Sequence, residues 1–209
     1  MSVRERKERE RAQRERLIVA TARRLAETHG WDAVTTRRLA DEIEYSQPVL
    51  YSHFRGMKEI MGAVALEGFA ELAAALRAAV PEGPAGRETV VAIARAYADF
   101  AARNHALYDA MFSLDNGLLF ADEATPAPMR EGFQALLDPL VDHAHPDDPG
   151  LYAETFWAAL HGLVTLTRGG RLPADRASDR FTLLANRFIP RPAGASQAPS
   201  DDPAGTTRR

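Results

Sequence analysis

The apolar positions near the start of the chain recur every three or four residues, which is the period of one face of a helix. From Arg14 onward this pattern predicts a first helix that ends at Gly30, because glycine commonly follows a helix C-terminus. Its inner face comprises Ile18, Ala22, Leu25, Ala26 and His29. The charge-dense residues 1–13 precede this pattern and have little to bury, so we expect a flexible arm there.

Two shorter helical patterns follow the first. Thr35 and Thr36 stand directly before RRLADEI, where a threonine is a favourable N-cap. Ser46 is a second capping residue, and Pro48 falls in the next first turn, where its missing N–H is harmless. A turn of about four residues separates these two helices, which is the spacing of a helix-turn-helix motif. Their inward positions are Leu39, Ala40, Ile43, Leu50 and Phe54.

The rest of the chain continues the helical period, and no strand pattern interrupts it. Helices are predicted over 57–80, 87–103, 105–113, 128–143, 151–168 and 174–189. We therefore expect an all-α protein of about nine helices, a three-helix helix-turn-helix head carrying a six-helix body. The predicted division is an arm over 1–13, a helix-turn-helix domain over 14–58, a helical body over 59–190, and a disordered Pro- and Ala-rich tail over 191–209.

Charge is unevenly distributed along the 209 residues, whose net charge is -3. Residues 1–58 carry 13 Lys and Arg against 9 Asp and Glu, whereas residues 59–209 carry 13 against 20. A basic head on an acidic body can steer the head toward phosphates. The chain has no cysteine, which suits a reducing cytoplasm, and no apolar run approaches the ~18 residues of a membrane span.

The outer face of the third predicted helix carries groups that suit a DNA groove. Gln47 can bond bidentately to adenine, and Pro48, Val49 and the Tyr51 ring can contact a thymine methyl group. Tyr51, Ser52 and His53 can hold phosphates. Arg37, near the start of the preceding helix, can reach a guanine edge or a phosphate.

The segment TTRRLADEIEYSQPVLYSHF, residues 35–54, resembles the DNA-binding head of the tetracycline-repressor (TetR) family. The resemblance implies that Thr36, Tyr51 and His53 contact phosphates. It further implies base-reading positions at Arg37, Gln47, Pro48 and Val49, with Ser52 beside them, and a core of Leu39, Ile43, Tyr45, Leu50 and Phe54.

Two positions depart from the family pattern. Glu44 stands where the family usually has glycine in the turn, so the turn must close without the freedom of glycine. Met57 stands where the family tends to have lysine, and the next residue, Lys58, is then the candidate phosphate ligand.

The body carries a second, looser resemblance. FWAALHGL, residues 156–163, is similar to the Trp-His-Gly motif of one type of TetR C-terminal domain. Bodies of this kind keep a cavity between their helices, which implies a small-molecule site. The aromatic and histidine residues expected around it are Tyr97, Tyr108, Phe112, Phe120, Phe133, Trp157 and His161. For His161 the alternative is a hydrogen-bonded histidine of the core.

No chemistry of an enzyme is evident in the sequence. Asp142, His143, His145, Asp147 and Asp148 fall in a proline-containing loop without zinc-like spacing, so we expect no metal. There is no nucleophile–base arrangement and no Gly-rich phosphate loop, so we expect neither catalysis nor a cofactor.

The resemblance implies a homodimeric transcriptional regulator in the cytoplasm. We expect a repressor that binds a palindromic double-stranded DNA operator and is released by a small-molecule effector. The last two helices would form the dimer, with Ala153, Ala158, Ala159 and Gly162 allowing close approach. Three alternatives stay open: an activator or co-repressor-dependent regulator, a helical small-molecule-binding protein without DNA binding and, last, a helical-bundle enzyme.

Overall fold

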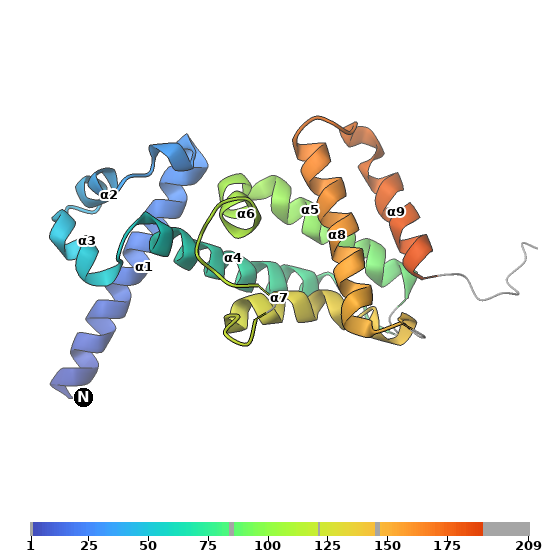
Figure 1. The fold of residues 1–209 in the computed structure, drawn as a ribbon, viewed down its shortest axis with the longest axis horizontal. Coiled ribbons are helices and arrows are strands. Elements are labelled where there is room, and N and C mark those ends of the chain that lie inside the picture. Colours follow the sequence, from blue (N-terminus) through green and yellow to red (C-terminus); the bar gives the residue numbers. More distant parts are fainter. Residues whose placement is uncertain (1, 84–85, 121, 145–146, 190–209) are drawn as a thin grey trace, which may run out of the picture.

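The computed structural model describes residues 2–83, 86–120, 122–144 and 147–189, and the regular elements in this part of the chain are all helices (Figure 1). The head consists of α1 (Val3–His29), α2 (Thr36–Glu42) and α3 (Gln47–His53), with a 3₁₀ turn at Trp31–Ala33. The body consists of α4 (Met57–Ala78), α5 (Arg87–Arg103), α6 (His105–Phe112), α7 (Ala127–Leu137), α8 (Pro149–Arg168) and α9 (Ala177–Phe188). For the described residues, the predicted all-α class with three head helices and six body helices is confirmed.

The first helix begins at Val3, so the flexible conformation expected for residues 2–13 is wrong. The Ser2 hydroxyl accepts the Glu5 N–H at 3.2 Å, while the Glu5 carboxylate accepts the Ser2 N–H at 2.8 Å. This reciprocal pair is a capping box, which satisfies two backbone donors that a helix start otherwise leaves free. Ion pairs spaced four residues apart, such as Arg11–Glu15 at 2.9 Å, add further support.

One body helix is shorter than expected. The pattern over 128–143 divides into α7, which ends at Leu137, and a 3₁₀ turn at Val141–His143. Pro139 is the reason, because it has no N–H to continue the helical hydrogen bonds. The tail predicted over 191–209 lies outside the described residues.

The head core is closed by buried aliphatic residues from its three helices, among them Ile18, Leu25, Leu39 and Leu50, each at most 2% exposed. The α2–α3 turn holds Glu44 at a φ of +57°. A non-glycine residue in this left-handed region is strained by its Cβ atom. The turn therefore closes as the helix-turn-helix requires, but at a cost that glycine would avoid.

Partly buried polar contacts join the head to the body. The Glu27 carboxylate accepts the N–H groups of Ala106 and Leu107 at 3.1 and 2.9 Å, in the first turn of α6. A carboxylate there satisfies free backbone donors and faces the positive end of the helix dipole. In addition, the Trp31 indole N–H donates to the Ala106 carbonyl at 2.7 Å. The head is thus fixed to the N-terminus of α6.

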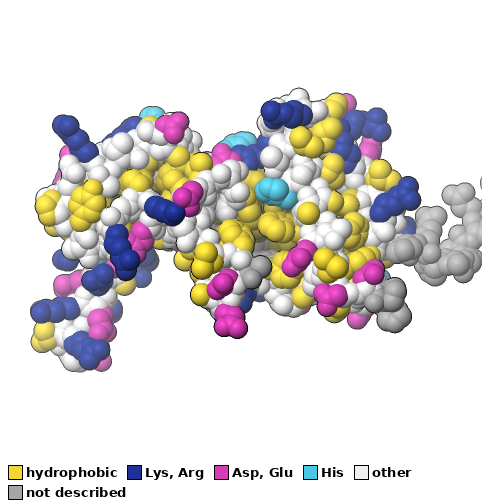
Figure 2. All heavy atoms as spheres, in the orientation of Figure 1, with side chains coloured by type: hydrophobic (Ala, Val, Ile, Leu, Met, Phe, Trp, Pro, Cys, Tyr) yellow, Lys and Arg dark blue, Asp and Glu magenta, His cyan; other side chains and the backbone are white. Residues whose placement is uncertain are grey.

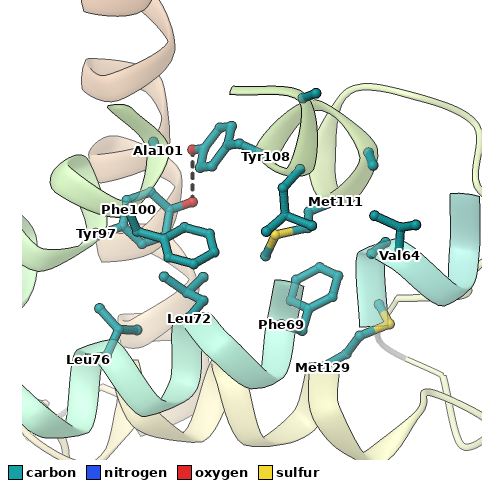
Figure 3. Packing of buried hydrophobic residues seen from close by; sticks show 14 of the residues in the cluster. Val64, Phe69, Leu72, Leu76, Tyr97, Phe100, Ala101, Tyr108, Met111 and Met129 are labelled. Atoms are coloured by element: carbon teal, nitrogen blue, oxygen red, sulfur yellow. Dashed lines mark hydrogen bonds between the residues drawn. The ribbon is translucent and has the colours of Figure 1, made fainter. Parts of the chain in front are cut away.

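The body is built around α4, which packs mainly against α7 and α6. Gly68 allows α4 and α6 to approach each other closely, because a Cβ atom at this position would lie 2.6 Å from the Met111 Sδ atom of α6. Figure 3 shows the buried side chains of α4, α5, α6 and α7 converging here, with Phe69 and Leu72 facing Met111 and Met129. None of the helices in the described ranges is long and apolar enough to span a bilayer.

Candidate nucleic-acid interface and internal cavity

The outward face of α3 is polar and open to solvent. Leu50 is buried on the inner side, whereas Gln47, Pro48, Tyr51 and Ser52 are exposed. The Tyr51 side chain is 52% exposed, which is high for a large aromatic residue on a folded head. Val49 is half-buried at the edge of this face. The helix therefore presents hydrogen-bonding groups and one aromatic ring outward from its first two turns.

The start of α2 lies beside this face. The Thr36 hydroxyl is 3.5 Å from the Tyr51 hydroxyl, so the two predicted phosphate ligands from different helices are neighbours. Arg37 is exposed and forms no ion pair within the described residues. The Thr35 hydroxyl accepts the Arg38 N–H at 3.1 Å and caps α2. These contacts place Thr36, Arg37 and Tyr51 on one continuous edge of the head.

His53 does not lie on the outer face, contrary to our expectation. Its side chain is only 5% exposed, and its Nδ1 atom is 3.2 Å from a carboxylate oxygen of Glu15 in α1. The helical period explains this, because His53 follows Leu50 by three residues and so shares its inward side. In this structure His53 holds the end of α3 against α1.

Lys58 lies near the start of α4 and is engaged with the body. Its Nζ atom is 2.7 Å from the Asp115 Oδ2 atom, in the segment that connects α6 to α7. The ammonium group holds the pKa of the Asp115 carboxyl below its usual value. Gly117, at a φ of +74°, makes room for the lysine, since a Cβ atom there would lie 2.9 Å from Lys58 Cε. The predicted phosphate ligand is therefore paired with a carboxylate.

The body encloses a cavity of about 830 Å³ between α4, α5, α7, α8 and the 113–126 segment. Five of the seven residues expected at a small-molecule site line it, namely Tyr97, Phe112, Phe120, Phe133 and Trp157. Other apolar lining residues are Phe69, Leu72, Met129 and Leu136. This volume falls in the range of sites for drug-sized molecules.

Tyr108 and His161 lie behind the cavity wall rather than on it. The Tyr97 hydroxyl accepts hydrogen bonds from the Trp157 indole N–H at 3.1 Å and from the Tyr108 hydroxyl at 3.0 Å. The His161 Nδ1 atom is 2.7 Å from the Tyr108 hydroxyl oxygen and 3.2 Å from that of Tyr97. For His161, the alternative of a hydrogen-bonded core histidine therefore describes its position.

Burial controls the protonation of this polar cluster. It raises the pKa of Tyr97 to about 12 and raises that of Tyr108 as well. Burial also lowers the pKa of His161, and the nearby Arg168 guanidinium adds to the effect. Arg168 lies over the Tyr108 ring, 4.8 Å from its centroid. At neutral pH the cluster is thus uncharged, and it fixes the orientation of Tyr97 and Trp157 at the cavity.

Sequence reasoning missed the polar residues around the cavity: Asp122, Glu123, Thr125, Arg130, Gln134 and Glu154. On a sequence they resemble ordinary surface positions. Glu154 does stand three residues before Trp157, a spacing that puts both on one helix face. Among the described residues, no group of three or more His, Cys, Asp and Glu side chains is placed to hold a metal ion.

Comparison with known proteins gives two family matches. Residues 18–64 match the model described as bacterial regulatory proteins, tetR family, and residues 90–188 match that of the tetracyclin repressor-like C-terminal domain. Together they span more than two thirds of the chain. The chain belongs to the TetR family.

Individual relatives agree with this assignment. Rv0681, an uncharacterized HTH-type transcriptional regulator of Mycobacterium tuberculosis, is 27% identical over 82% of this chain and 78% of its own length. A protein of unknown function from Rhodococcus sp. RHA1 superimposes with a TM-score of 0.69 at 27% identity, covering 83% of this chain and 92% of that one. BioQ, solved with its double-stranded DNA operator, has the same fold, with a TM-score of 0.59 at 22% identity over 83% and 96% of the two chains.

Within the TetR family, the first matched segment includes α2 and α3 with their exposed edge, and the second includes all five of the cavity residues that the sequence predicted. The protein is thus a TetR-family transcriptional regulator with a helix-turn-helix DNA-binding domain. The α2–α3 edge is the candidate nucleic-acid interface, and the cavity is the candidate small-molecule site.

Proposed function

We propose that this TetR-family protein is a repressor that binds a palindromic operator as a homodimer and is released by a small molecule. The observation that carries the proposal is the exposed α2–α3 edge, with Arg37, Gln47 and Tyr51 turned to solvent on a family DNA-binding head. Helices of this type enter the major groove by their N-terminal residues. We assign base reading to Arg37, Gln47, Pro48 and Val49, and phosphate contact to Thr36, Tyr51 and Ser52.

The homodimer is proposed to form through α8 and α9, which pack against each other within the protomer. Ala159 and Leu166 of α8 and Leu183 of α9 are exposed, and Leu183 is 56% so, whereas Ala158 borders the cavity. Apolar and small residues on a helix pair suit a four-helix interface between two copies. Ala153 is instead fully buried inside the protomer, so it does not contribute to that face.

The release step needs a path from the cavity to the head, and the 113–126 segment offers one. Phe120 of this segment lines the cavity, and Asp115 of the same segment holds Lys58 at the start of α4. Asn116 stiffens the connection by donating to the Ala110 carbonyl at 2.6 Å. A ligand that binds one arrangement of this segment more tightly shifts the population of head positions.

A matched pair of variants tests the interface. Fluorescence anisotropy would follow binding to duplex DNA from upstream of the protein's own coding region. Arg37→Ala should weaken specific binding about tenfold or more, since a bidentate contact to a base discriminates by ~1–3 kcal/mol. Arg103→Ala removes an equally exposed charge from the body and should leave affinity nearly unchanged. Equal losses in both variants would contradict the assigned interface.

A further inference from the structure

The cavity has a charge imbalance among its polar lining residues. Asp122, Glu123 and Glu154 contribute three carboxylates, whereas Arg130 is the one basic lining residue. The Arg130 guanidinium donates a hydrogen bond to the Thr125 carbonyl, so it already has a partner in the wall. Carboxylates therefore outnumber cations at this site, and the single cation is engaged.

Two of the three carboxylates are free. Asp122 accepts the Ala124 N–H at 2.8 Å, but Glu123 and Glu154 form no hydrogen bond or ion pair within the described ranges. Both glutamates are exposed, which places them at the solvent side of the cavity rather than at its buried end. Glu154 and Ala158 are four residues apart on α8, so this carboxylate stands on the helix face that borders the cavity.

Aromatic side chains form a large part of the remaining wall, beside Leu72, Met129 and Leu136. Phe69 packs edge-to-face on Phe112 with centroids 5.3 Å apart and on Phe120 at 5.9 Å, and Phe112 lies 5.9 Å from Trp157. Figure 2 shows apolar side chains gathered at the centre of this side of the body, with acidic side chains on either side of them. Ring faces carry negative electrostatic potential and attract cations, most strongly where water is excluded.

We propose that the cavity binds a monovalent organic cation, whose ammonium or amidinium group lies at the mouth between Glu154 and Glu123 and whose aromatic or branched apolar body lies among the rings. This inference rests on the proposed role of the cavity as the effector site. The position of the carboxylates at the mouth keeps the charged group partly solvated and avoids a large desolvation penalty. An anionic ligand of the same shape would instead meet the carboxylates.

Three probes that share a biphenyl body separate charge from apolar burial. They are (biphenyl-4-ylmethyl)trimethylammonium, its uncharged carbon isostere in which a tert-butyl group replaces the trimethylammonium, and biphenyl-4-carboxylate. Binding to the full-length protein would be measured by titration calorimetry. The cation should bind about tenfold more tightly than the isostere, from ring and carboxylate attraction together. Equal affinities, or tighter binding of the carboxylate, would overturn the inference.

Substitutions of the carboxylates at the cavity mouth test where the charged group of the ligand binds. Glu154→Gln should lower the affinity for the cation about threefold and leave the affinity for the isostere unchanged. The double variant Glu154→Gln with Glu123→Gln should lower the affinity for the cation further. Glu131→Gln is the matched control, because Glu131 is an exposed carboxylate on α7 outside the cavity lining. A preference that is undiminished in the double variant would overturn the placement of the charged group.

The same probes distinguish failure of this inference from failure of the proposed function. Cation binding that leaves DNA affinity unchanged would contradict the effector role and still support the ligand class. Conversely, the protein could bind DNA specifically while the cation binds no more tightly than the other two probes. That result would contradict the ligand class but not the proposed role as a regulator.

Discussion

The head and the cavity are built in different ways. The exposed edge of the head comes from two helices whose first residues, Thr36 and Gln47, are only eleven positions apart, whereas the cavity needs segments from α4 to α8. A local surface can keep its shape if its few core residues pack well. A cavity wall depends instead on contacts between distant segments, such as the hydrogen bond from Trp157 to Tyr97. Changes in the head should therefore act on DNA binding directly, and changes in the body should act through packing.

The largest expected effect comes from the head core. Leu50 is 1% exposed on the inner side of α3, and Leu50→Ala would leave a cavity there. Such substitutions cost about 2–5 kcal/mol. Urea denaturation should show this loss of stability, together with loss of DNA binding. The same substitution at the exposed Leu151 should change little, and equal destabilisation by both would contradict the assigned core.

The polar cluster behind the cavity should be the next most sensitive feature. Tyr97→Phe removes the acceptor of the Trp157 indole N–H, and an unsatisfied donor costs about 1–3 kcal/mol, whereas the Tyr108 hydroxyl keeps the His161 Nδ1 atom as a partner. Thermal denaturation should report the loss of stability. Tyr51→Phe removes an exposed hydroxyl from the head and is the matched control, with an expected change near zero. Comparable losses would mean that the cluster is not structural.

Replacing Glu44 should stabilise the head. The residue has a φ of +57°, and Glu44→Gly relieves strain of roughly 1 kcal/mol. Glu44→Ala keeps the Cβ atom and should give no such gain. Chemical denaturation of both variants checks this prediction. If alanine stabilised the protein as much as glycine, the carboxylate and not the backbone would be responsible.

Acidification should destabilise the body through His161. Burial lowers its pKa, so the unfolded chain binds a proton more readily than the folded one. Its contribution is therefore retained above the unfolded pKa of about 6.5 and lost as pH falls below it. Stability measured between about pH 7 and 5 should fall less steeply in His161→Asn than in the wild type. An unchanged slope would exclude His161 as the titrating group.

The smallest effect is expected at the Lys58–Asp115 pair, which is exposed to solvent. Asp115→Asn frees Lys58 for a DNA phosphate and should raise DNA affinity about threefold, with a slightly steeper salt dependence. Lys58→Met should lower affinity, and adding Asp115→Asn to it should have no further effect. A gain from Asp115→Asn that persists without Lys58 would show a general charge effect.

The local parts of this structure were accessible to sequence reasoning. The Thr35 cap and the apolar spacing of Leu39 and Leu50 fix α2 and α3 through near neighbours, so the helix-turn-helix could be predicted. The inward orientation of His53 follows from the same period, but its partner Glu15 could not be predicted, since it lies 38 residues away. His53 was expected on the outer face because it belongs to the family motif, although its helical position places it on the inner side.

The cavity was predictable only in its aromatic part. Phe112, Phe120 and Trp157 are large apolar residues that must pack somewhere in a helical body. Glu154 and Arg130 look like solvated helix positions, and only the packing of α7 and α8 brings them to the same opening. The charge of the site, which decides the class of ligand, therefore required the three-dimensional structure.

The most direct test of the proposed repressor is sequence-specific DNA binding by the wild-type protein. Anisotropy would compare the duplex from upstream of its own coding region with a scrambled duplex of the same composition, across a salt series. The account predicts a preference of about 10³-fold or more for the native sequence at physiological salt, with affinity for both falling steeply as salt rises. Equal affinity for the two duplexes at every salt concentration would contradict an operator at that site, and the same result with random genomic fragments would contradict the regulator itself.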